Sequence, residues 1–287
     1  MKAISGKTTI CGVIGDPVEH TMSPAMHNAA YRTLGLDFVY LPFHVKPRDL
    51  PHAISGMKAL NIRGLNVTIP HKTSVIPLID KVDELAAKIG AVNTIANDKG
   101  KLIGYNTDAQ GFMEALNQHD VDPADKKVLL LGAGGAARAI AFILAETQAE
   151  IIILNRKQEI DWAYDIVKNI KAHYSVNLKV DELTDANLKS SIADADILVN
   201  ATSVGMSPND EKSPVPAELL CSNLTVFDAV YNPLPTRLLK EAKGAGANTV
   251  DGLEMLVWQG ALAFEKWTGV HPPVDVMRQA AIEVLQK

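Results

Sequence analysis

The chain is poor in cysteine, in aromatic residues and in net charge, and each shortage excludes a class of protein. Its 287 residues include two cysteines and 5% aromatic residues, and the formal net charge is -5. Two isolated cysteines, with no Cys-x-x-Cys pair and no histidine pair at ligand spacing, support neither a disulfide scaffold nor a zinc site. A weakly acidic chain offers no electrostatic attraction to nucleic acid or to an anionic membrane surface. We therefore expect no metal, no nucleic-acid partner and no membrane partner.

Long hydrophobic stretches are also scarce. One apolar run, residues 128–145, contains Arg138 near its middle and three glycines near its start. This pattern favours a strand, a turn and a buried helix over a membrane span. The first fifteen residues lack the continuous apolar core of a secretory signal. We expect a cytoplasmic protein.

Short runs rich in Val, Ile and Leu alternate with helical patterns along the chain. We expect strands at residues 8–14, 38–45, 64–69, 91–96, 128–131, 151–154, 176–180, 197–200 and 226–228. Helices are expected to open near Ser23, Lys46, Asp83 and Asp108, and two more between residues 253 and 287, separated by Pro272-Pro273. This alternation predicts an α/β architecture with parallel strands.

A glycine-rich turn follows the most apolar strand. It consists of Gly132, Ala133, Gly134, Gly135 and Ala136. The first glycine permits a tight turn, the second allows a pyrophosphate to approach the backbone, and Ala137 is the third small position. The structural alternative is a tight strand-to-helix turn without a ligand. Because a strand precedes the turn and an Ala-rich helix follows it, we predict dinucleotide binding here.

The next strand ends in Asn155-Arg156-Lys157. NAD-binding folds usually place an acidic residue there to accept a hydrogen bond from the ribose 2′-hydroxyl. Two cations after an asparagine suit a 2′-phosphate better, although a solvated basic helix start remains the alternative. We predict that NADP is the preferred cofactor and that NAD use is also possible.

The length favours two packed units rather than one. A polar, proline-containing stretch at residues 120–127 marks the entrance to the second sheet. We expect a first α/β domain at residues 1–109, a Rossmann-like dinucleotide-binding domain at 110–251, and C-terminal helices at 252–287 that return to the first domain.

Polar residues cluster at strand ends in the first domain. Thr21 and Ser23 place two hydroxyls before a helix, where Ser23 as N-cap is the structural alternative. Asn66 and Thr68 point to the same face of a strand, and Asn93 lies at the end of a neighbouring element. Each one alone could be a turn or capping residue.

Together the motifs resemble the shikimate/quinate dehydrogenase family. The similar segments are His-Thr-Met-Ser-Pro (20–24), Gly-Leu-Asn-Val-Thr-Ile-Pro-His-Lys (64–72), Gly-Ala-Val-Asn-Thr (90–94), Asn-Thr-Asp (106–108), Gly-Ala-Gly-Gly-Ala (132–136), Asn-Ala-Thr-Ser-Val-Gly-Met (200–206), Tyr-Asn-Pro (231–233) and Asp-Gly-Leu-Glu-Met-Leu-Val-Trp-Gln-Gly (251–260). The resemblance spans nearly the whole chain and implies an NAD(P)-linked oxidation of a ring hydroxyl, reversibly converting shikimate and 3-dehydroshikimate in chorismate and aromatic amino acid biosynthesis.

The resemblance also implies roles for individual residues. Lys72 would transfer the proton, and Asp108 would orient Lys72 and the substrate hydroxyl. The substrate-binding positions implied in this way are Thr21, Ser23, Asn66, Thr68, Asn93, Tyr231 and Gln259. Gly252 would meet the nicotinamide, and Met206 would pack near it. The first domain is thereby identified as the substrate-binding and catalytic domain.

Two other functions remain open from the sequence. One is a quinate/shikimate dehydrogenase that uses NAD in catabolism, and the other is a catalytically silent ligand sensor with a Rossmann fold. Retention of both Lys72 and Asp108 disfavours the sensor. The sequence is compatible with a monomer or a homodimer.

Overall fold

The computed structural model describes residues 3–286, and the chain divides into two compact units. The first unit comprises the chain up to Thr107 together with the segment from Val257 onward, and the second spans Asp108–Leu256. The sequence predicts these boundaries after residues 109 and 251. The assignment of substrate and cofactor to the units stays a prediction. Residues 1–2 and 287, the outer ends of the expected first and last segments, lie outside the described residues.

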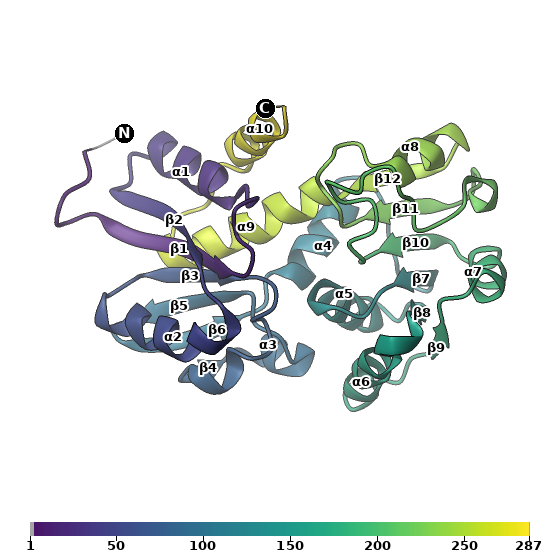
Figure 1. The fold of residues 1–287 in the computed structure, drawn as a ribbon, viewed down its shortest axis with the longest axis horizontal. Helices are drawn as coiled ribbons and strands as arrows, with labels where there is room; N and C mark the ends of the chain where they lie inside the picture. Colours follow the sequence, from purple (N-terminus) through teal and green to yellow (C-terminus); the bar gives the residue numbers. More distant parts are fainter. Residues whose placement is uncertain (1–2, 287) are drawn as a thin grey trace. The chain divides into compact units, whose positions relative to one another are not determined.

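The first unit contains a mixed six-stranded sheet in the order β2-β1-β3-β5-β6-β4 (Figure 1). Its strands are β1 (Thr9–Gly15), β2 (Phe38–His44), β3 (Gly64–Val67), β4 (Lys81–Val82), β5 (Thr94–Asp98) and β6 (Lys101–Tyr105). Strand β1 pairs in parallel with β2 and β3, as the sequence predicts, whereas β5 runs antiparallel to both β3 and β6. The antiparallel hairpin was not predicted. Its two-residue turn, Lys99-Gly100, has positive φ at both positions, the geometry that hairpin twist favours.

Helices cover both faces of this sheet. They are α1 (Ser23–Thr33), α2 (Leu50–Ala59), α3 (Glu84–Ile89), most of α9 (Gly252–Thr268) and α10 (Val274–Leu285), with short 3₁₀ helices η1 (Pro47–Asp49) and η2 (Ile76–Leu78). On one face, α2 and α3 pack on a core that includes Leu65 and Ile95. On the other face the Trp267 indole of α9 donates to the Ile95 carbonyl at 3.0 Å, and α10 packs on α1. The expected return of the C-terminal helices to the first unit is confirmed.

The second unit contains a wholly parallel sheet in the order β12-β11-β10-β7-β8-β9. Its strands are β7 (Lys127–Leu131), β8 (Glu150–Asn155), β9 (Leu178–Glu182), β10 (Ile197–Asn200), β11 (Thr225–Asp228) and β12 (Asn248–Asp251). This is the doubly wound order of dinucleotide-binding folds. Strands β8 and β9 are added on one side of β7, and strands β10, β11 and β12 are added on its other side, so that the order of strands switches between β7 and β10. The predicted α/β class with a Rossmann-like unit is confirmed. Strand β12 of this unit was not predicted from the sequence, and neither were β4 and β6 of the first unit.

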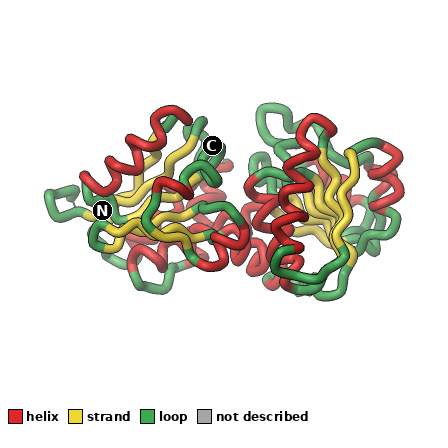
Figure 2. Tube along the Cα trace, turned by 90° about the horizontal axis from the view of Figure 1, so that it is seen from below, coloured by secondary structure: helices red, strands yellow, loops and turns green. Residues whose placement is uncertain are grey.

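The helices of the second unit also lie on both faces of its sheet (Figure 2). They are α4 (Asp108–Asn117), α5 (Gly135–Glu146), α6 (Ile160–Lys171), α7 (Asp185–Ile192) and α8 (Arg237–Gly244), with η3 (Lys157–Glu159) and η4 (Ala217–Leu219). Leucines of β7 alternate: Leu129 and Leu131 join the core under α7 and α8. On the opposite face the Phe112 ring of α4 packs edge-on against Phe227 of β11 at 4.8 Å.

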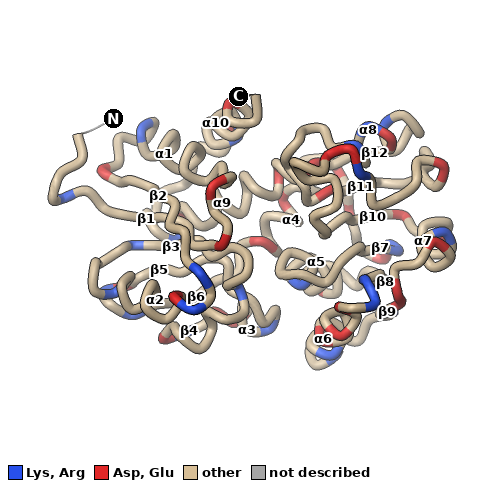
Figure 3. The backbone as a smooth tube through the Cα atoms, viewed as in Figure 1, with Lys and Arg blue, Asp and Glu red and all other residues tan. Residues whose placement is uncertain are grey.

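Each unit contains charged residues of both signs. Basic and acidic positions are interspersed along the two units (Figure 3), in keeping with the small net charge. None of the helices within residues 3–286 combines the length and the apolar composition that a membrane span requires. The apolar run at 128–145 instead forms β7, the glycine turn and α5, as predicted.

Candidate active site

The carboxyl ends of β1, β2 and β3 lie at one edge of the first sheet. The register pairs Gly15 with His44 and Ile14 with Val67, so the three strands end side by side. The antiparallel hairpin brings the start of β5 and the end of β6 to the same edge, because Thr94 pairs with Asn66 and with Tyr105. The polar residues predicted from the sequence in this unit, apart from Gln259 on α9, are therefore carried on this edge or on the loops that leave it.

Thr21 and Ser23 lie on the loop after β1, where α1 begins. The N-cap position is Met22, and Ser23 is already the first helical residue. The alternative of Ser23 as the capping residue is therefore wrong, and no side chain caps this helix. The Thr21 hydroxyl instead donates to Ser23 Oγ at 3.3 Å and accepts from the Ser23 amide at 3.3 Å. This geometry holds the two hydroxyls together as a pair.

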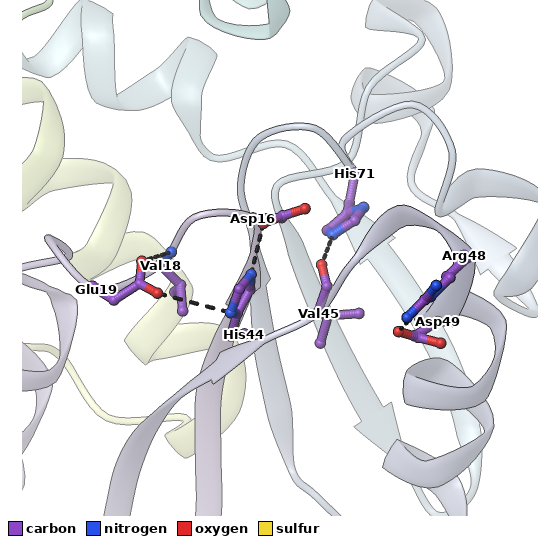
Figure 4. A network of polar contacts seen from close by, with 8 residues as sticks. All are labelled: Asp16, Val18, Glu19, His44, Val45, Arg48, Asp49 and His71. Atoms are coloured by element: carbon purple, nitrogen blue, oxygen red, sulfur yellow. Dashed lines mark hydrogen bonds and ion pairs between the residues drawn. The ribbon is translucent and has the colours of Figure 1, made fainter.

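Contacts at the end of β2 anchor the loops on either side of it (Figure 4). His44 Nε2 lies 2.6 Å from Asp16 Oδ1, and Nδ1 lies 3.8 Å from Glu19 Oε1. The buried His71 ring places Nε2 2.6 Å from the Val45 carbonyl. The first set of contacts steadies the loop that leads to Thr21, and the second steadies the turn that leads to Lys72.

Lys72 follows that turn and is half-buried. Its carbonyl accepts a hydrogen bond from the Val92 amide at 2.8 Å, which ties the lysine backbone to the strand edge beside Asn93. Asp108 is the first residue of α4 and is 5% exposed. It directly follows Thr107, whose amide donates to Asn93 Oδ1 at 2.8 Å. The pairing of Lys72 with Asp108 in catalysis stays a prediction.

A buried network of amides and hydroxyls connects three of the predicted substrate-binding residues. Asn66 Nδ2 donates to Thr94 Oγ1 at 3.1 Å, and Thr94 Oγ1 donates to Asn93 Oδ1 at 3.0 Å. Asn93 Nδ2 in turn donates to Gln259 Oε1 of α9 at 3.4 Å. Thr68 follows β3 and is half-buried at the same edge. Such groups suit a polyhydroxylated ligand, since each ligand hydroxyl needs a donor and an acceptor.

Three residues of this network were not among the predicted site residues, although Thr107 lies in the Asn-Thr-Asp segment (106–108) that carries the family resemblance. Thr94 and Thr107 bond to one another at 3.2 Å, and the Tyr40 hydroxyl donates to Asn66 Oδ1 at 2.7 Å. A threonine beside Asn93 gave a weak signal within the Gly-Ala-Val-Asn-Thr motif. Tyr40 gave none, because it lies in an apolar strand and reaches Asn66 only through the pairing of β2 and β3 with β1.

In the second unit the strands of the sheet also end at a common edge. Leu131 pairs with Leu154 and with Asn200, and Asp228 pairs with Asn200 and with Asp251. The glycine turn therefore lies beside the segments after β8 and β10. This edge, at the switch in strand order, is where open α/β sheets bind ligands.

The conformation of the glycine turn fits a phosphate-binding role. Gly132 has φ of +99°, and a Cβ there would lie 3.0 Å from the Thr202 side chain. Gly134 is the N-cap of α5 and provides no side-chain cap, while a Cβ at Gly134 would meet no atom within 4 Å. Gly135 opens the helix, and the buried Ala137 packs closely. The backbone amides of an uncapped first helical turn are suited to bind an anion.

The predicted 2′-phosphate cluster follows β8. Asn155 is buried, and its Nδ2 donates to the Glu159 carbonyl at 2.6 Å. Arg156 and Lys157 are exposed. Arg156 Nη2 lies 2.7 Å from Glu159 Oε2, an ion pair that was not predicted from the sequence. The guanidinium is accessible to a ligand phosphate, and the acidic neighbour would compete with it.

Two further loops of this edge carry Met206 and Tyr231. Met206 is 48% exposed, and burial raises the pKa of Tyr231, which keeps its phenol neutral. Gly252 begins α9, and a Cβ there would lie 2.5 Å from the Ala229 carbonyl oxygen. Only glycine fits at this close backbone approach. Whether Met206 and Gly252 meet a nicotinamide, and Tyr231 a substrate carboxylate, stays a prediction.

Three models of protein families match this chain, and all three describe shikimate dehydrogenase domains. The model of the shikimate dehydrogenase substrate binding domain matches residues 13–95. The shikimate / quinate 5-dehydrogenase model matches residues 114–212, and the shikimate 5'-dehydrogenase C-terminal domain matches 252–282. These three ranges lie in both units and cover more than half of the chain.

Curated and solved relatives agree with the family models. A shikimate dehydrogenase (NADP(+)) of Carboxydothermus hydrogenoformans is 49% identical over 96% of this chain and 98% of its own length. A crystal structure of a shikimate dehydrogenase in complex with NADP+ superposes with a TM-score of 0.91 at 45% identity, covering 99% of this chain and 98% of the other. The Listeria monocytogenes enzyme in complex with shikimate and NAD gives 0.90 at 41% identity, with 97% and 98% covered.

Proposed function

Because this chain belongs to the shikimate dehydrogenase family, we propose that it catalyses the reversible, NADP-dependent interconversion of shikimate and 3-dehydroshikimate. The observation that carries the proposal is the buried network from Asn66 through Thr94 and Asn93 to Gln259. A purely structural strand edge has no need for four linked amide and hydroxyl side chains. The reaction belongs to chorismate and aromatic amino acid biosynthesis.

Substrate recognition divides between two sets of side chains in this proposal. The hydroxyl pair of Thr21 and Ser23, together with Tyr231, holds the substrate carboxylate. Hydroxyl donors bind a carboxylate without placing a second negative charge near it. The ring hydroxyls are bound by Asn66, Thr68, Asn93 and Gln259. A substrate analogue that lacks one of these hydroxyls would leave a buried partner unpaired, at a cost of about 1–3 kcal/mol.

Proton transfer is the task of Lys72 in this mechanism. When shikimate is oxidised, the reacting carbon loses a hydride and its hydroxyl loses a proton, so that a carbonyl forms. The Lys72 amine accepts that proton, and in the reverse direction its ammonium returns it. Asp108 orients Lys72 and the substrate hydroxyl, so that the proton donor and acceptor are aligned before reaction.

The residues of the second unit fit a dinucleotide. Gly134 leaves room for a ligand where a Cβ would meet no protein atom, and α5 begins without a side-chain cap. The residues that would hold NADP are Gly132, Ala133, Gly134, Gly135, Ala136, Asn155, Arg156, Lys157, Met206 and Gly252. When bound, NADP+ supplies the hydride acceptor. Arg156 and Lys157 favour the 2′-phosphate form, which is also the form in the complex with NADP+ described above.

Steady-state kinetics over both substrates and both cofactors test the proposal. Shikimate and quinate are each oxidised with NADP+ and with NAD+, and kcat/KM is measured for the four combinations. We expect the highest value for shikimate with NADP+. A quinate reaction that is fastest with NAD+ would favour the catabolic alternative. The absence of turnover in all four combinations would favour a ligand sensor.

The oligomeric state and the cytoplasmic location expected from the sequence stay predictions. The assembly can be monomeric or homodimeric without changing the assignment of Lys72. The substrate, in this proposal, is a small cyclic acid, and neither nucleic acid nor membrane takes part in the reaction.

A further inference from the structure

We propose that Tyr40 is a positioning residue for substrate recognition: its hydroxyl fixes the side chain of Asn66 in the orientation that binds a substrate hydroxyl. The inference rests on the proposed function, because it assigns a role to a residue behind the substrate-binding side chains. Tyr40 itself is 1% exposed, so it acts through Asn66 rather than on the ligand.

The contact between the two side chains is short and buried. The Tyr40 hydroxyl donates to Asn66 Oδ1 at 2.7 Å, and neither atom is at the surface. Burial raises the pKa of the Tyr40 phenol well above its ordinary value, which keeps the donor proton in place. The phenol therefore stays a hydrogen-bond donor to the Asn66 side-chain oxygen.

Tyr40 is held rigidly from several sides. Its amide donates to Asn28 Oδ1 at 2.9 Å, and its carbonyl accepts from Asn28 Nδ2 at 2.9 Å. The His27 ring stacks on the tyrosine ring with centroids 4.3 Å apart and planes 3° apart. Because both the backbone and the ring of Tyr40 are fixed, its hydroxyl can hold the side-chain amide of Asn66 in one orientation.

The other neighbours of Asn66 determine which way its amide must point. The Thr94 hydroxyl donates its hydrogen to Asn93, so it can only accept from Asn66. The Asn93 carbonyl, 3.3 Å from Nδ2, is also an acceptor. Both hydrogens of the Asn66 amide therefore point toward this pair, and Oδ1 points toward Tyr40. Without the Tyr40 hydroxyl, a buried Oδ1 would lose its donor and the amide could rotate.

This arrangement has a consequence for the substrate. An amide oxygen accepts two hydrogen bonds, and Tyr40 occupies one of the two positions on Oδ1. The second position is the one that Asn66 can offer, so Asn66 receives a hydrogen bond from a substrate hydroxyl. Tyr40 in this way determines that the substrate group facing Asn66 is a hydrogen-bond donor.

Tyr31 provides a matched control in the same aromatic cluster. It is 1% exposed, and its ring lies 6.2 Å from His27 and 5.1 Å from Phe264. Its buried hydroxyl has no hydrogen-bond partner among the described residues, so it bonds to no substrate-binding side chain. Tyr31→Phe and Tyr40→Phe each remove one buried hydroxyl from the same core, and only the second removes a contact with Asn66.

The experiment compares these two variants with the wild-type protein. KM and kcat are measured for shikimate at saturating NADP+ and for NADP+ at saturating shikimate, and thermal unfolding is recorded for each protein. For Tyr40→Phe we expect the shikimate KM to rise on the order of tenfold, with the NADP+ KM unchanged. For Tyr31→Phe we expect both KM values to stay near wild type. On an Asn66→Ala background, Tyr40→Phe should add little, because the two residues act as one unit.

Three results would overturn the positioning role. They are equal shikimate KM values for the two tyrosine variants, an NADP+ KM that rises in parallel, and full additivity with Asn66→Ala. Shikimate binding measured by calorimetry separates this inference from the proposed function. If the wild-type protein binds shikimate without oxidising it, the proposed function fails, and the affinities of the two variants still decide the role of Tyr40. If the wild-type protein does not bind shikimate, both fail.

Discussion

The side-chain amide of Asn200 donates a 2.8 Å hydrogen bond to Asp228 Oδ1, joining the ends of β10 and β11. The same carboxylate accepts from the Val230 amide at 3.1 Å and from the Thr236 hydroxyl at 2.7 Å. Asn200 Oδ1 accepts from the Thr202 hydroxyl at 2.7 Å. One buried pair therefore organises the two loops that carry Met206 and Tyr231.

Asp228 makes the stability of the protein depend on pH. Burial raises its pKa to about 6 despite the three hydrogen bonds, which lower it. A carboxyl whose pKa is higher in the folded than in the unfolded state contributes most stability below pH 4, and that contribution is lost as pH rises through 6. The loss amounts to about 3 kcal/mol at neutral pH. In Asp228→Asn this pH-dependent contribution to the free energy of unfolding should be absent.

Urea unfolding of wild type and Asp228→Asn at pH 4.5, 5.5 and 7 checks this prediction. The free energy of unfolding of the variant, relative to wild type, should increase with pH across this range. A difference that is constant with pH would mean that Asp228 titrates no differently in the folded and unfolded states.

His27 makes the protein less stable as pH falls, which is the opposite of the effect of Asp228. Its ring is fully buried, neither nitrogen has a hydrogen-bond partner among the described residues, and burial lowers its pKa to about 3. A histidine whose pKa is lowered in the folded state destabilises the fold as pH falls below 6.5. The reason is that its ring becomes protonated in the unfolded state and stays neutral in the folded state. At pH 5 this costs about 2 kcal/mol.

His27→Phe keeps an aromatic ring on Tyr40 and removes the titrating group. We expect the thermal midpoint of the variant to fall less than that of wild type between pH 7 and pH 5. Tyr31→Phe, in the same cluster, is the control and should follow the wild-type curve. Equal acid sensitivity of His27→Phe and wild type would show that another group is responsible.

Gly134→Ala separates folding from cofactor binding. A Cβ at Gly134 meets no protein atom within 4 Å, and the residue has an ordinary negative φ of -74°. The variant should therefore fold with an unchanged thermal midpoint. Its methyl group would occupy space assigned to the pyrophosphate, so the NADP+ KM should rise about tenfold, equivalent to 1.4 kcal/mol.

Gly244→Ala is the matched control for this prediction, because a Cβ at Gly244 also meets no atom within 4 Å and the residue ends α8 of the same unit. Its NADP+ KM should equal that of wild type. If Gly134→Ala retains the wild-type NADP+ KM, the pyrophosphate does not approach this glycine.

The second sheet was the more predictable of the two. Each of its buried strands is a short apolar run, and the glycine turn after β7 identifies the start of a nucleotide-binding unit. The mixed pairing of the first sheet was not predictable from such runs. Strand β6 has only one fully apolar pair, Leu102-Ile103, and its antiparallel direction depends on the local turn at Lys99-Gly100.

Individual side chains of the site were predictable where a motif carried them. Ser23 shows where prediction from a local motif fails. A serine before a proline predicts an N-cap, but the helix begins one residue earlier, at Ser23 itself. The Ser23 hydroxyl instead accepts a hydrogen bond from Thr21. Tyr40 and Asp228 were missed for a common reason. Each acts through residues far away in the sequence, and only the order of strands in the sheet brings them into contact.

The central claim is that Lys72 transfers the proton, and single-residue replacement tests it most directly. In Lys72→Ala, kcat for shikimate oxidation should fall by at least about 100-fold, the scale of general acid–base catalysis, while the shikimate KM changes little. Added methylamine should restore part of the lost rate, because it supplies an amine to the space left by the side chain. Lys81→Ala, which removes an exposed lysine of the same unit, should retain wild-type kinetics. A Lys72→Ala variant with wild-type kcat would contradict the account.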